Sequence, residues 1–287
     1  MGKKNVMFMV ALAALFMSAS CSNGTRKNSA EAYSAKEVEQ ARQMEKYYDT
    51  SLEVLRKVVP EKSINSVLEF MEQEDVKPVP APLVPPVYSQ KDSAFVVNPG
   101  DYFDEETRRN LIQSYMKLFK TRKLFYANYD RYLSLLKAND KAEADKILPV
   151  NYQLSVDLSE YKENILDMLT PFMDDAQSVL LNGNPMKEQL LYMKRMTATM
   201  HSILYLCKRK PAPDMARLDM KLMKLVIQLD IARRLPAVEG HPQEMKEFQD
   251  FLEDVENFIK DVQHIKSEER FNEEYLAALE KYGVSLD

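Results

Sequence analysis

Residues 104–139 read DEETRRNLIQSYMKLFKTRKLFYANYDRYLSLLKAN, and their apolar side chains recur at helical spacing. Acidic residues open the stretch, where carboxylates favour the positive end of a helix dipole. Two adjacent apolar stripes make the face wider than the seam of a two-stranded coiled coil. We therefore expect a long helix that contacts two neighbours inside a bundle. The stripes consist of Leu111, Tyr115, Leu118, Phe125, Tyr129, Tyr132 and Leu136, and of Ile112, Phe119, Tyr126 and Leu133.

The same spacing continues over most of the chain. A self-similar repeat of fixed length is not apparent, which disfavours a solenoid. With only 6 glycines, and strand propensity confined to Phe95-Val96-Val97, the sequence predicts an all-α fold: an irregular bundle of long, mostly antiparallel helices. The other expected helical segments are 34–59, 63–74, 140–148, 156–181, 186–207, 215–232 and 242–283, the last with a bend near 267–272.

Prolines divide these segments. Residues 76–100 carry five prolines near their start and are expected to form an extended crossover lying on the helices. Pro149 is expected to stop the preceding short helix, and Pro171 to kink or break the helix around it. Asn184 and Pro185 suit the start of the next helix, after a left-handed Gly183.

The N-terminus has the features of an export signal. Lys3 and Lys4 precede an uncharged run from Val6 to Met17, which is shorter than the roughly 20 residues of a membrane-spanning helix. Small residues follow it, which an ordinary signal peptidase could also cleave. The junction Ser18-Ala19-Ser20-Cys21 resembles the lipobox of bacterial lipoproteins, in which the cysteine is lipidated and becomes the first mature residue. We therefore predict a signal peptide over 1–20, a lipidated Cys21 with a flexible tether over 21–33, and one helical domain over 34–287.

Charge and cysteine content exclude some functions. The chain of 287 residues has a formal net charge of −5, which disfavours nucleic acid as a partner. Its second cysteine, Cys207, lies in an apolar helical pattern and is expected to be a buried small hydrophobe. With Cys21 lipidated, no internal disulfide can form.

Catalytic motifs are largely missing from the sequence. The 3 histidines fall on different predicted segments, and phosphate-binding, dinucleotide-binding and hydrolase-elbow motifs do not occur. We therefore expect no cofactor, and a binding protein more readily than an enzyme. One short pattern, Gly240-His241-Pro242-Gln243-Glu244, resembles the His-x-x-Glu motif of imelysin-like exported helical proteins, which implies His241 and Glu244 as metal ligands. We favour instead a structural role, in which Pro242 and Glu244 lie in the first turn of a helix, and we therefore predict no metal site.

The general plan resembles the uncharacterised, all-helical YiiG-like lipoproteins. The resemblance rests on the signal, the cysteine junction, and tyrosine-rich helices such as Glu45-Lys46-Tyr47-Tyr48 and Phe125-Tyr126-Ala127-Asn128-Tyr129-Asp130. It implies the fold but no reaction.

Three functions remain open from the sequence. The leading hypothesis is a lipid-anchored envelope protein, at the outer membrane and facing the periplasm, whose non-catalytic body binds an envelope protein. The alternatives are an imelysin-like metal-binding protein and a small-ligand carrier with a tyrosine-lined groove. The identity of the partner, the oligomeric state and the exact membrane are not specified by these patterns.

Overall fold

The computed structural model describes residues 33–73, 85–209 and 212–283, and every regular element within them is helical. The expected all-α fold is confirmed. The predicted signal peptide, Cys21 and nearly all of the predicted tether lie outside the described residues. Over the described residues, no helix combines the length and the apolar character needed to cross a membrane.

Contacts divide the chain into two compact units, whereas the apolar spacing predicted one helical domain over 34–287. Unit 2 contains Ser34–Leu181 together with Tyr205–Leu218, and unit 1 contains Asn182–Leu204 together with Asp219–Ser285. The division was not visible in the apolar spacing because both units are built from similar amphipathic helices. It also falls inside a helical pattern, at residues 204 and 205.

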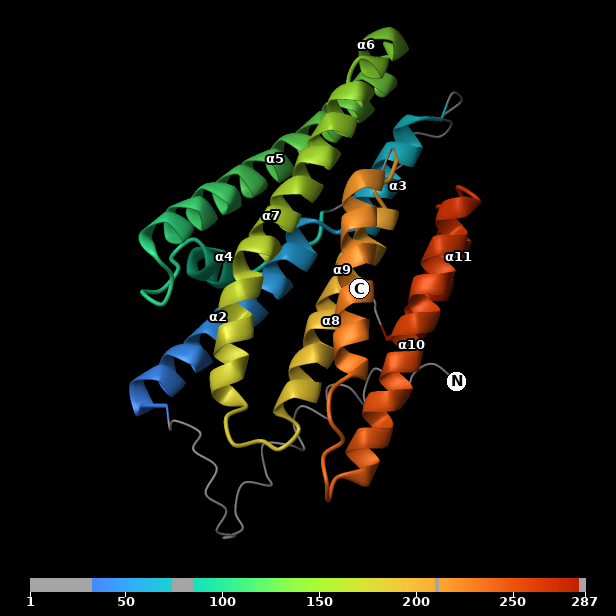
Figure 1. Cartoon of the computed structure of the whole chain (residues 1–287). Coiled ribbons are helices and arrows are strands. Elements are labelled where there is room, and N and C mark those ends of the chain that lie inside the picture. The colour runs from blue at the N-terminus through green and yellow to red at the C-terminus, as the bar shows by residue number, and fades with distance from the viewer. Residues whose placement is uncertain (1–32, 74–84, 210–211, 284–287) are drawn as a thin grey trace. The chain divides into compact units, whose positions relative to one another are not determined.

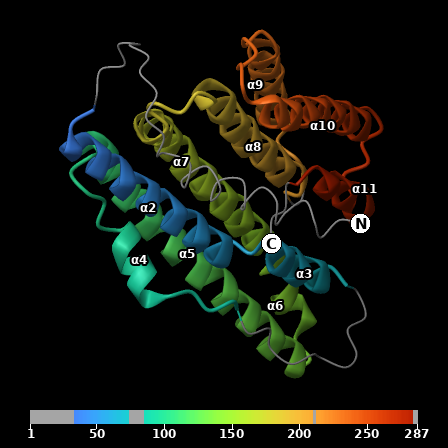
Figure 2. The same ribbon diagram turned by 90° about the horizontal axis from the view of Figure 1, so that it is seen from below.

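Unit 2 is organised around two 33-residue helices, α5 (Glu105–Lys137) and α7 (Leu148–Leu180). They lie side by side and are connected through α6 (Lys141–Asp145), as Figure 1 shows. Figure 2 shows α2 (Ala35–Val58) along the same pair, and α2 packs mainly on α7. The shorter α3 (Glu61–Met71) also packs on α7. Pro60 separates α2 from α3, as predicted.

The sequence 104–139 forms the expected helix. The Asp104 side chain is the N-cap and accepts a hydrogen bond of 2.8 Å from the Thr107 N–H. The first apolar stripe is largely buried, and its tyrosine rings lie in the core. In the neighbouring stripe Tyr126 and Leu133 are also buried, whereas Ile112 is 37% exposed. The width of the face is explained by the contacts of α5 with both α7 and α2.

The prediction for Pro149 was wrong, and the break expected as one outcome at Pro171 does not occur. Pro149 lies in the first turn of α7, where its missing N–H would have had no helical partner, so it starts a helix instead of stopping one. Pro171 does not break α7, which continues through it to Leu180. Tertiary packing on α2 and α5 offsets the lost hydrogen bond in the helix interior.

The predicted crossover 76–100 is not wholly extended. Residues 74–84 lie outside the described residues, but Gln90–Val96 forms the helix α4, which includes most of the expected strand-like Phe95-Val96-Val97. The Ser89 hydroxyl caps α4, and Val96 is buried against the bundle. Val87 is 83% exposed, whereas the Tyr88 ring stacks on Phe119 of α5 at 5.5 Å.

Unit 1 contains α8 (Lys187–Cys207, up to Leu204), α9 (Met215–Arg233, from Asp219), α10 (Pro242–Ser267), α11 (Glu273–Ala278) and the 3-10 turn η1 (Leu279–Tyr282). Side-chain contacts confirm that α8 and α9 are antiparallel: Gln189 reaches the Pro236 carbonyl, and Thr199 bonds Gln228. The predicted start of α8 is also correct. Gly183 has φ of 80°, and the Asn184 side chain accepts a hydrogen bond from the Met186 N–H.

Candidate functional site

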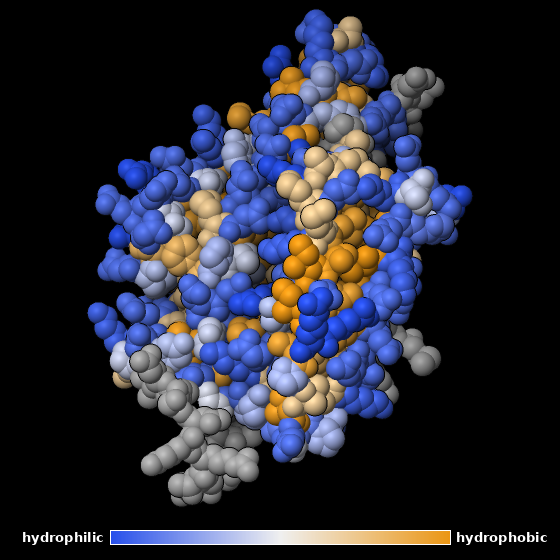
Figure 3. Space-filling model, in the orientation of Figure 1, coloured by the Kyte–Doolittle hydropathy of each residue, from blue (hydrophilic) through white to orange (hydrophobic). Residues whose placement is uncertain are grey.

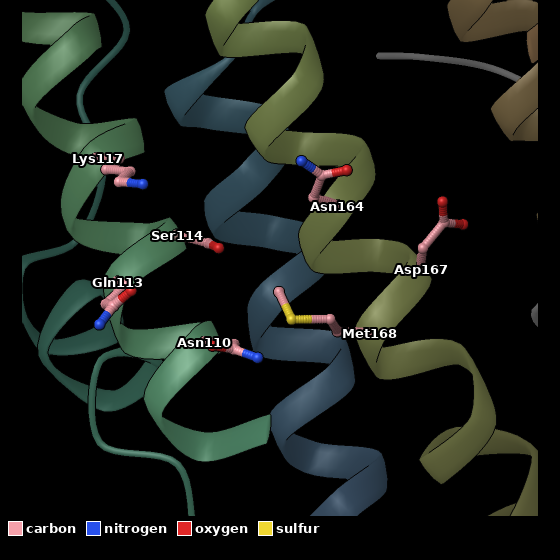
Figure 4. A pocket seen from close by; sticks show the side chains of 7 residues that line it. All are labelled: Asn110, Gln113, Ser114, Lys117, Asn164, Asp167 and Met168. Carbon is pink, nitrogen blue, oxygen red and sulfur yellow. The ribbon is translucent and has the colours of Figure 1, made fainter. Parts of the chain in front are cut away.

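A hollow lies on unit 2, between α5 and α7 (Figure 4). It is open to solvent, and its volume is about 550 Å³. Side chains spaced at i, i+3, i+4 and i+7 share one face of α5, and side chains at i, i+3 and i+4 share the facing surface of α7. They are Asn110, Gln113, Ser114 and Lys117 on α5, and Asn164, Asp167 and Met168 on α7.

The lining of this polar hollow is suited to hydrogen bonding. Figure 4 shows Asn110 and Ser114 extending toward α7, and Met168 extending toward α5. Three of the seven lining residues are carboxamides, each of which offers both a donor and an acceptor. Lys117 and Asp167 add one charge of each sign. A ligand that matches this surface has alternating donors and acceptors, as a peptide backbone has.

A second polar arrangement, the ionic cluster, lies within unit 2 where the segment 205–217 meets α3 and α7. The Lys162 ammonium is 2.6 Å from a Glu61 carboxylate oxygen, and both side chains are nearly buried. The same ammonium lies 3.9 Å from the centre of the Tyr205 ring. Further pairs join Arg209 to Glu160 at 3.3 Å and Arg217 to Glu163 at 2.5 Å. We define the ionic cluster as Glu61, Glu160, Lys162, Glu163, Arg209, Asp214 and Arg217.

The electrostatics of the ionic cluster indicate a structural role. Burial raises the pKa of the Tyr205 hydroxyl well above its usual value, and the nearby Glu61 carboxylate adds to the effect, so Tyr205 stays neutral. Burial, the largest single influence, would lower the pKa of Arg217, but its hydrogen bond to Glu163 and the negative charges of Glu163, Glu160 and Asp214 together raise it. Every cation of the ionic cluster thus has a carboxylate partner. These ion pairs hold the segment 205–217 on α3 and α7. The Asn65 side-chain amide of α3 adds a hydrogen bond to the Lys208 carbonyl.

The structure places His241 and Glu244 at a helix start. His241 precedes α10, Pro242 begins it, and Glu244 lies in its first turn. The His241 Nδ1 atom is 3.4 Å from a Glu244 carboxylate oxygen. Hydrogen bonding to its own backbone N–H, and then to His241, lowers the pKa of Glu244. Over the described residues, no group of three or more His, Cys, Asp or Glu side chains is placed to hold a metal ion.

This geometry gives a prediction for His241. His241→Ala should leave the metal content of the purified protein unchanged, because no cluster of metal-binding side chains occurs among the described residues. The melting temperature should fall only slightly, because the helix dipole stabilises a first-turn Glu without His241, typically by about 0.3–1 kcal/mol. Elemental analysis of wild type and variant, prepared side by side, measures this. Stoichiometric zinc, iron or copper that disappears in His241→Ala would instead support the metal-binding alternative.

Other residues singled out in the sequence are in the core. Burial raises the pKa of the Cys207 thiol to about 12, so the thiol remains protonated and unreactive at neutral pH. The tyrosines of α5 are Tyr115, Tyr126, Tyr129 and Tyr132, and all four are at least 93% buried. None of them lines the polar hollow. The structure therefore does not place the expected tyrosine-lined groove on α5.

Two family models match the chain, and they meet near residue 184, close to the first boundary between unit 2 and unit 1. Residues 35–183 match a domain of unknown function, DUF6845, and residues 185–287 match the C-terminal domain of DUF3829-like proteins. A crystal structure of an uncharacterized DUF3829-like protein from Bacteroides thetaiotaomicron is 38% identical, covering 86% of this chain and 97% of that chain, with a TM-score of 0.77. The chain belongs to the DUF3829-like family.

A second solved structure is similar to this DUF3829-like chain. It is an alpha helical protein from Bacteroides fragilis, 47% identical over 88% of this chain and 98% of that chain, with a TM-score of 0.83. No curated protein matches the chain. The comparisons confirm the coarser part of the predicted resemblance, a helical family described without a function. The finer parts, a YiiG-like protein and a lipoprotein, stay predictions.

Neither the polar hollow nor the ionic cluster was predicted from the sequence. The spacing of Asn110, Gln113, Ser114 and Lys117 is visible in the sequence, but it is also the ordinary pattern of a solvated helix face. The sequence does not show which residues of α7 face these residues of α5, because that depends on how the two helices pack. The ionic cluster joins residues as far as 101 positions apart, and local spacing carries no signal for such pairs.

Proposed function

We propose that this chain is a lipid-anchored protein of the bacterial cell envelope whose helical body binds an envelope protein without catalysis. In this proposal the lipid on Cys21 holds the chain at the outer membrane, and the body faces the periplasm. The partner binds in the polar hollow through an extended segment. The observation that carries the binding role is the polar lining of the hollow, which three carboxamides dominate.

The hollow favours a peptide over other ligands. A carboxamide can donate to a backbone carbonyl and accept from a backbone N–H at the same time. An apolar small molecule would desolvate these groups without replacing their hydrogen bonds, which is costly. Met168 is the single residue of the lining with an apolar side chain.

The start of the folded body supports a tethered arrangement. Ser34 is the N-cap of α2, and with Glu37 it forms a capping box: the Ser34 hydroxyl accepts from the Glu37 N–H, and the Glu37 carboxylate accepts from the Ser34 N–H at 2.7 Å. Such a motif fixes the first residue of a helix. In this proposal, residues 21–33, which precede α2 in the sequence, supply the length of the tether.

The anchor is tested at Cys21. In cells grown with a labelled fatty acid, the wild-type chain should be labelled and Cys21→Ser should not, because the thiol is the site of acylation. A chain that carries several acyl groups should remain in the membrane fraction, whereas Cys21→Ser should leave it. Cys207→Ser is the matched control and should be labelled like wild type. Equal labelling of wild type and Cys21→Ser would contradict the anchor.

The binding role is tested by filling the polar hollow. Ser114→Arg places a long cation between α5 and α7, and it should abolish crosslinking of the chain to its partner in intact envelopes. Ser134→Arg introduces the same side chain on an exposed position of α5 outside the hollow, and it should preserve the crosslink. Both variants should keep wild-type circular dichroism. Loss of the crosslink in both variants, or in neither, would contradict binding at the hollow.

A further inference from the structure

The helix α9 is apolar on two opposite faces. Its inner face is buried through residues at core spacing, which are Leu218, Leu222, Leu225, Leu229 and Ala232. Its outward face carries Met220, Met223 and Ile227, which are 64%, 67% and 53% exposed, with Ile231 and Val226 beside them. We call these five exposed residues the α9 stripe. Figure 3 shows an apolar surface where Figure 1 draws α9.

Such a helix is expected to be covered on both faces. A surface helix normally has charged or polar residues opposite its buried side, and a helix that is apolar all round is typically buried. Scattered exposed apolar residues are ordinary, but a continuous stripe marks an interaction surface. The residues of the α9 stripe are contiguous because they recur at i+3, i+4 and i+7 on one helix.

The spacing of the α9 stripe matches a heptad seam. Met220 and Ile227 take the a positions, and Ala216 and Met223 take the d positions. The g positions beside them are Asp219 and Val226, and the e positions are Lys224 and Ile231. The seam ends at Asp230, whose carboxylate pairs with Arg234 of the same helix.

The flanking residues distinguish the possible arrangements of two such helices. In a parallel pair in register, each g residue meets the e residue five positions later in the other helix. Asp219, whose carboxylate also pairs with Lys266 of α10 in its own chain, then meets Lys224 of the second copy, and Val226 meets Ile231 of the second copy. In an antiparallel pair g meets g and e meets e, so a charge would lie against an apolar side chain. Charge and apolar complementarity therefore favour the parallel pair.

We propose that a second copy of this chain covers the α9 stripe, with the two α9 helices parallel and in register. An anionic membrane would meet Asp219 and Asp230 on one flank of the stripe and Lys221 and Lys224 on the other, and it is distinguished from a second copy by the test below. The pairing does not depend on the lipid anchor. It is also independent of the polar hollow, which belongs to the other unit.

Cysteine crosslinking of the full chain tests this arrangement. Met220→Cys and Ile227→Cys each place a thiol at an a position, where it meets its own counterpart in a parallel pair. Mild oxidation should therefore give severalfold more covalent dimer from either single variant than from wild type, which reports any dimer formed through Cys21 or Cys207. Gln249→Cys, at an exposed polar position of α10, is the control and should stay at the wild-type level.

A charge reversal gives a second, independent measurement. Lys224→Glu places a carboxylate beside Asp219 of the second copy, so it should reduce the Met220→Cys crosslink severalfold without altering the fold of the monomer. Crosslinks that form only in a mixture of the two cysteine variants would indicate an antiparallel pair and overturn the proposal. The proposal would also be overturned if neither variant formed crosslinks although its introduced thiol still reacted with a soluble reagent. Protection of both thiols by anionic lipid vesicles, with no dimer, would identify a membrane as the occupant instead.

Discussion

Above pH about 10, where tyrosine ionises in an unfolded chain, the free energy of unfolding should fall by at least about 4 kcal/mol per pH unit, because each tyrosine that stays neutral in the fold contributes about 1.4 kcal/mol. Burial raises the pKa of several tyrosines, Tyr48 and Tyr152 among them, and it raises that of Tyr47, Tyr115 and Tyr205 far above this range. The unfolded chain therefore releases at least three protons that the folded chain retains. Stability that is fully present below pH 10 is lost as the pH rises.

The structure explains why these three hydroxyls resist ionisation. Tyr47 is fully buried, and its hydroxyl donates a hydrogen bond of 2.6 Å to the Val96 carbonyl, a contact that an ionised oxygen would lose. Tyr115 is also fully buried, on the inner face of α5. Tyr205 lies beside Glu61 and Glu163, whose negative charges disfavour a further negative charge on the Tyr205 oxygen. All three lie in unit 2, so alkaline unfolding should begin there.

The test compares urea unfolding at a series of pH values. Tyr115→Phe keeps the ring and removes one buried hydroxyl, so it should reduce the alkaline slope by about 1.4 kcal/mol per pH unit. Tyr33→Phe changes a tyrosine that is 37% exposed and should leave the slope unchanged. The ultraviolet absorbance of tyrosinate should appear together with unfolding. An equal slope in wild type and Tyr115→Phe would show that the Tyr115 hydroxyl ionises within the folded protein.

The fold was largely predictable because its information is local. The wide apolar face of 104–139 requires two neighbours, and the structure supplies them as α2 and α7. Cap residues such as Asp104 and Asn184 act within one turn, and sequence spacing identifies them directly. Pro149 was misread for a local reason as well. A proline that ends one helix and a proline in the first turn of the next helix cannot be told apart in the sequence, because packing decides which position the proline takes.

The candidate sites were less predictable because they depend on packing between distant segments. Lys162 is one position before Glu163 in α7, yet the two residues have different partners, Glu61 and Arg217, from different parts of the chain. The polar hollow similarly needs the register of α5 against α7. The α9 stripe could be read from the sequence as helical spacing, but only burial showed that Met220, Met223 and Ile227 point outward.

Removing one partner of the buried pair between Glu61 and Lys162 should be strongly destabilising. The two side chains are only 12% and 11% exposed, so Glu61→Ala would leave the Lys162 ammonium in a poorly solvated site without its carboxylate. Breaking a buried ion pair in this way costs about 3 kcal/mol or more. For a chain of this size the melting temperature should fall by roughly 6–12 °C, measured by circular dichroism during heating.

Two further variants separate the loss of the partner from the loss of the pair. In Glu61→Leu combined with Lys162→Met, both charges are replaced by apolar groups of similar size, and stability should return to near the wild-type value because no ion is left unpaired. The matched control is Glu53→Ala on α2. There Glu53 pairs with Lys57 at 2.6 Å, but both side chains are 39% exposed, so the loss should be about 0.5 kcal/mol or less. If Glu61→Ala costs no more than Glu53→Ala, water solvates Lys162 in the folded protein, and the ionic cluster does not hold the segment 205–217 on α3 and α7.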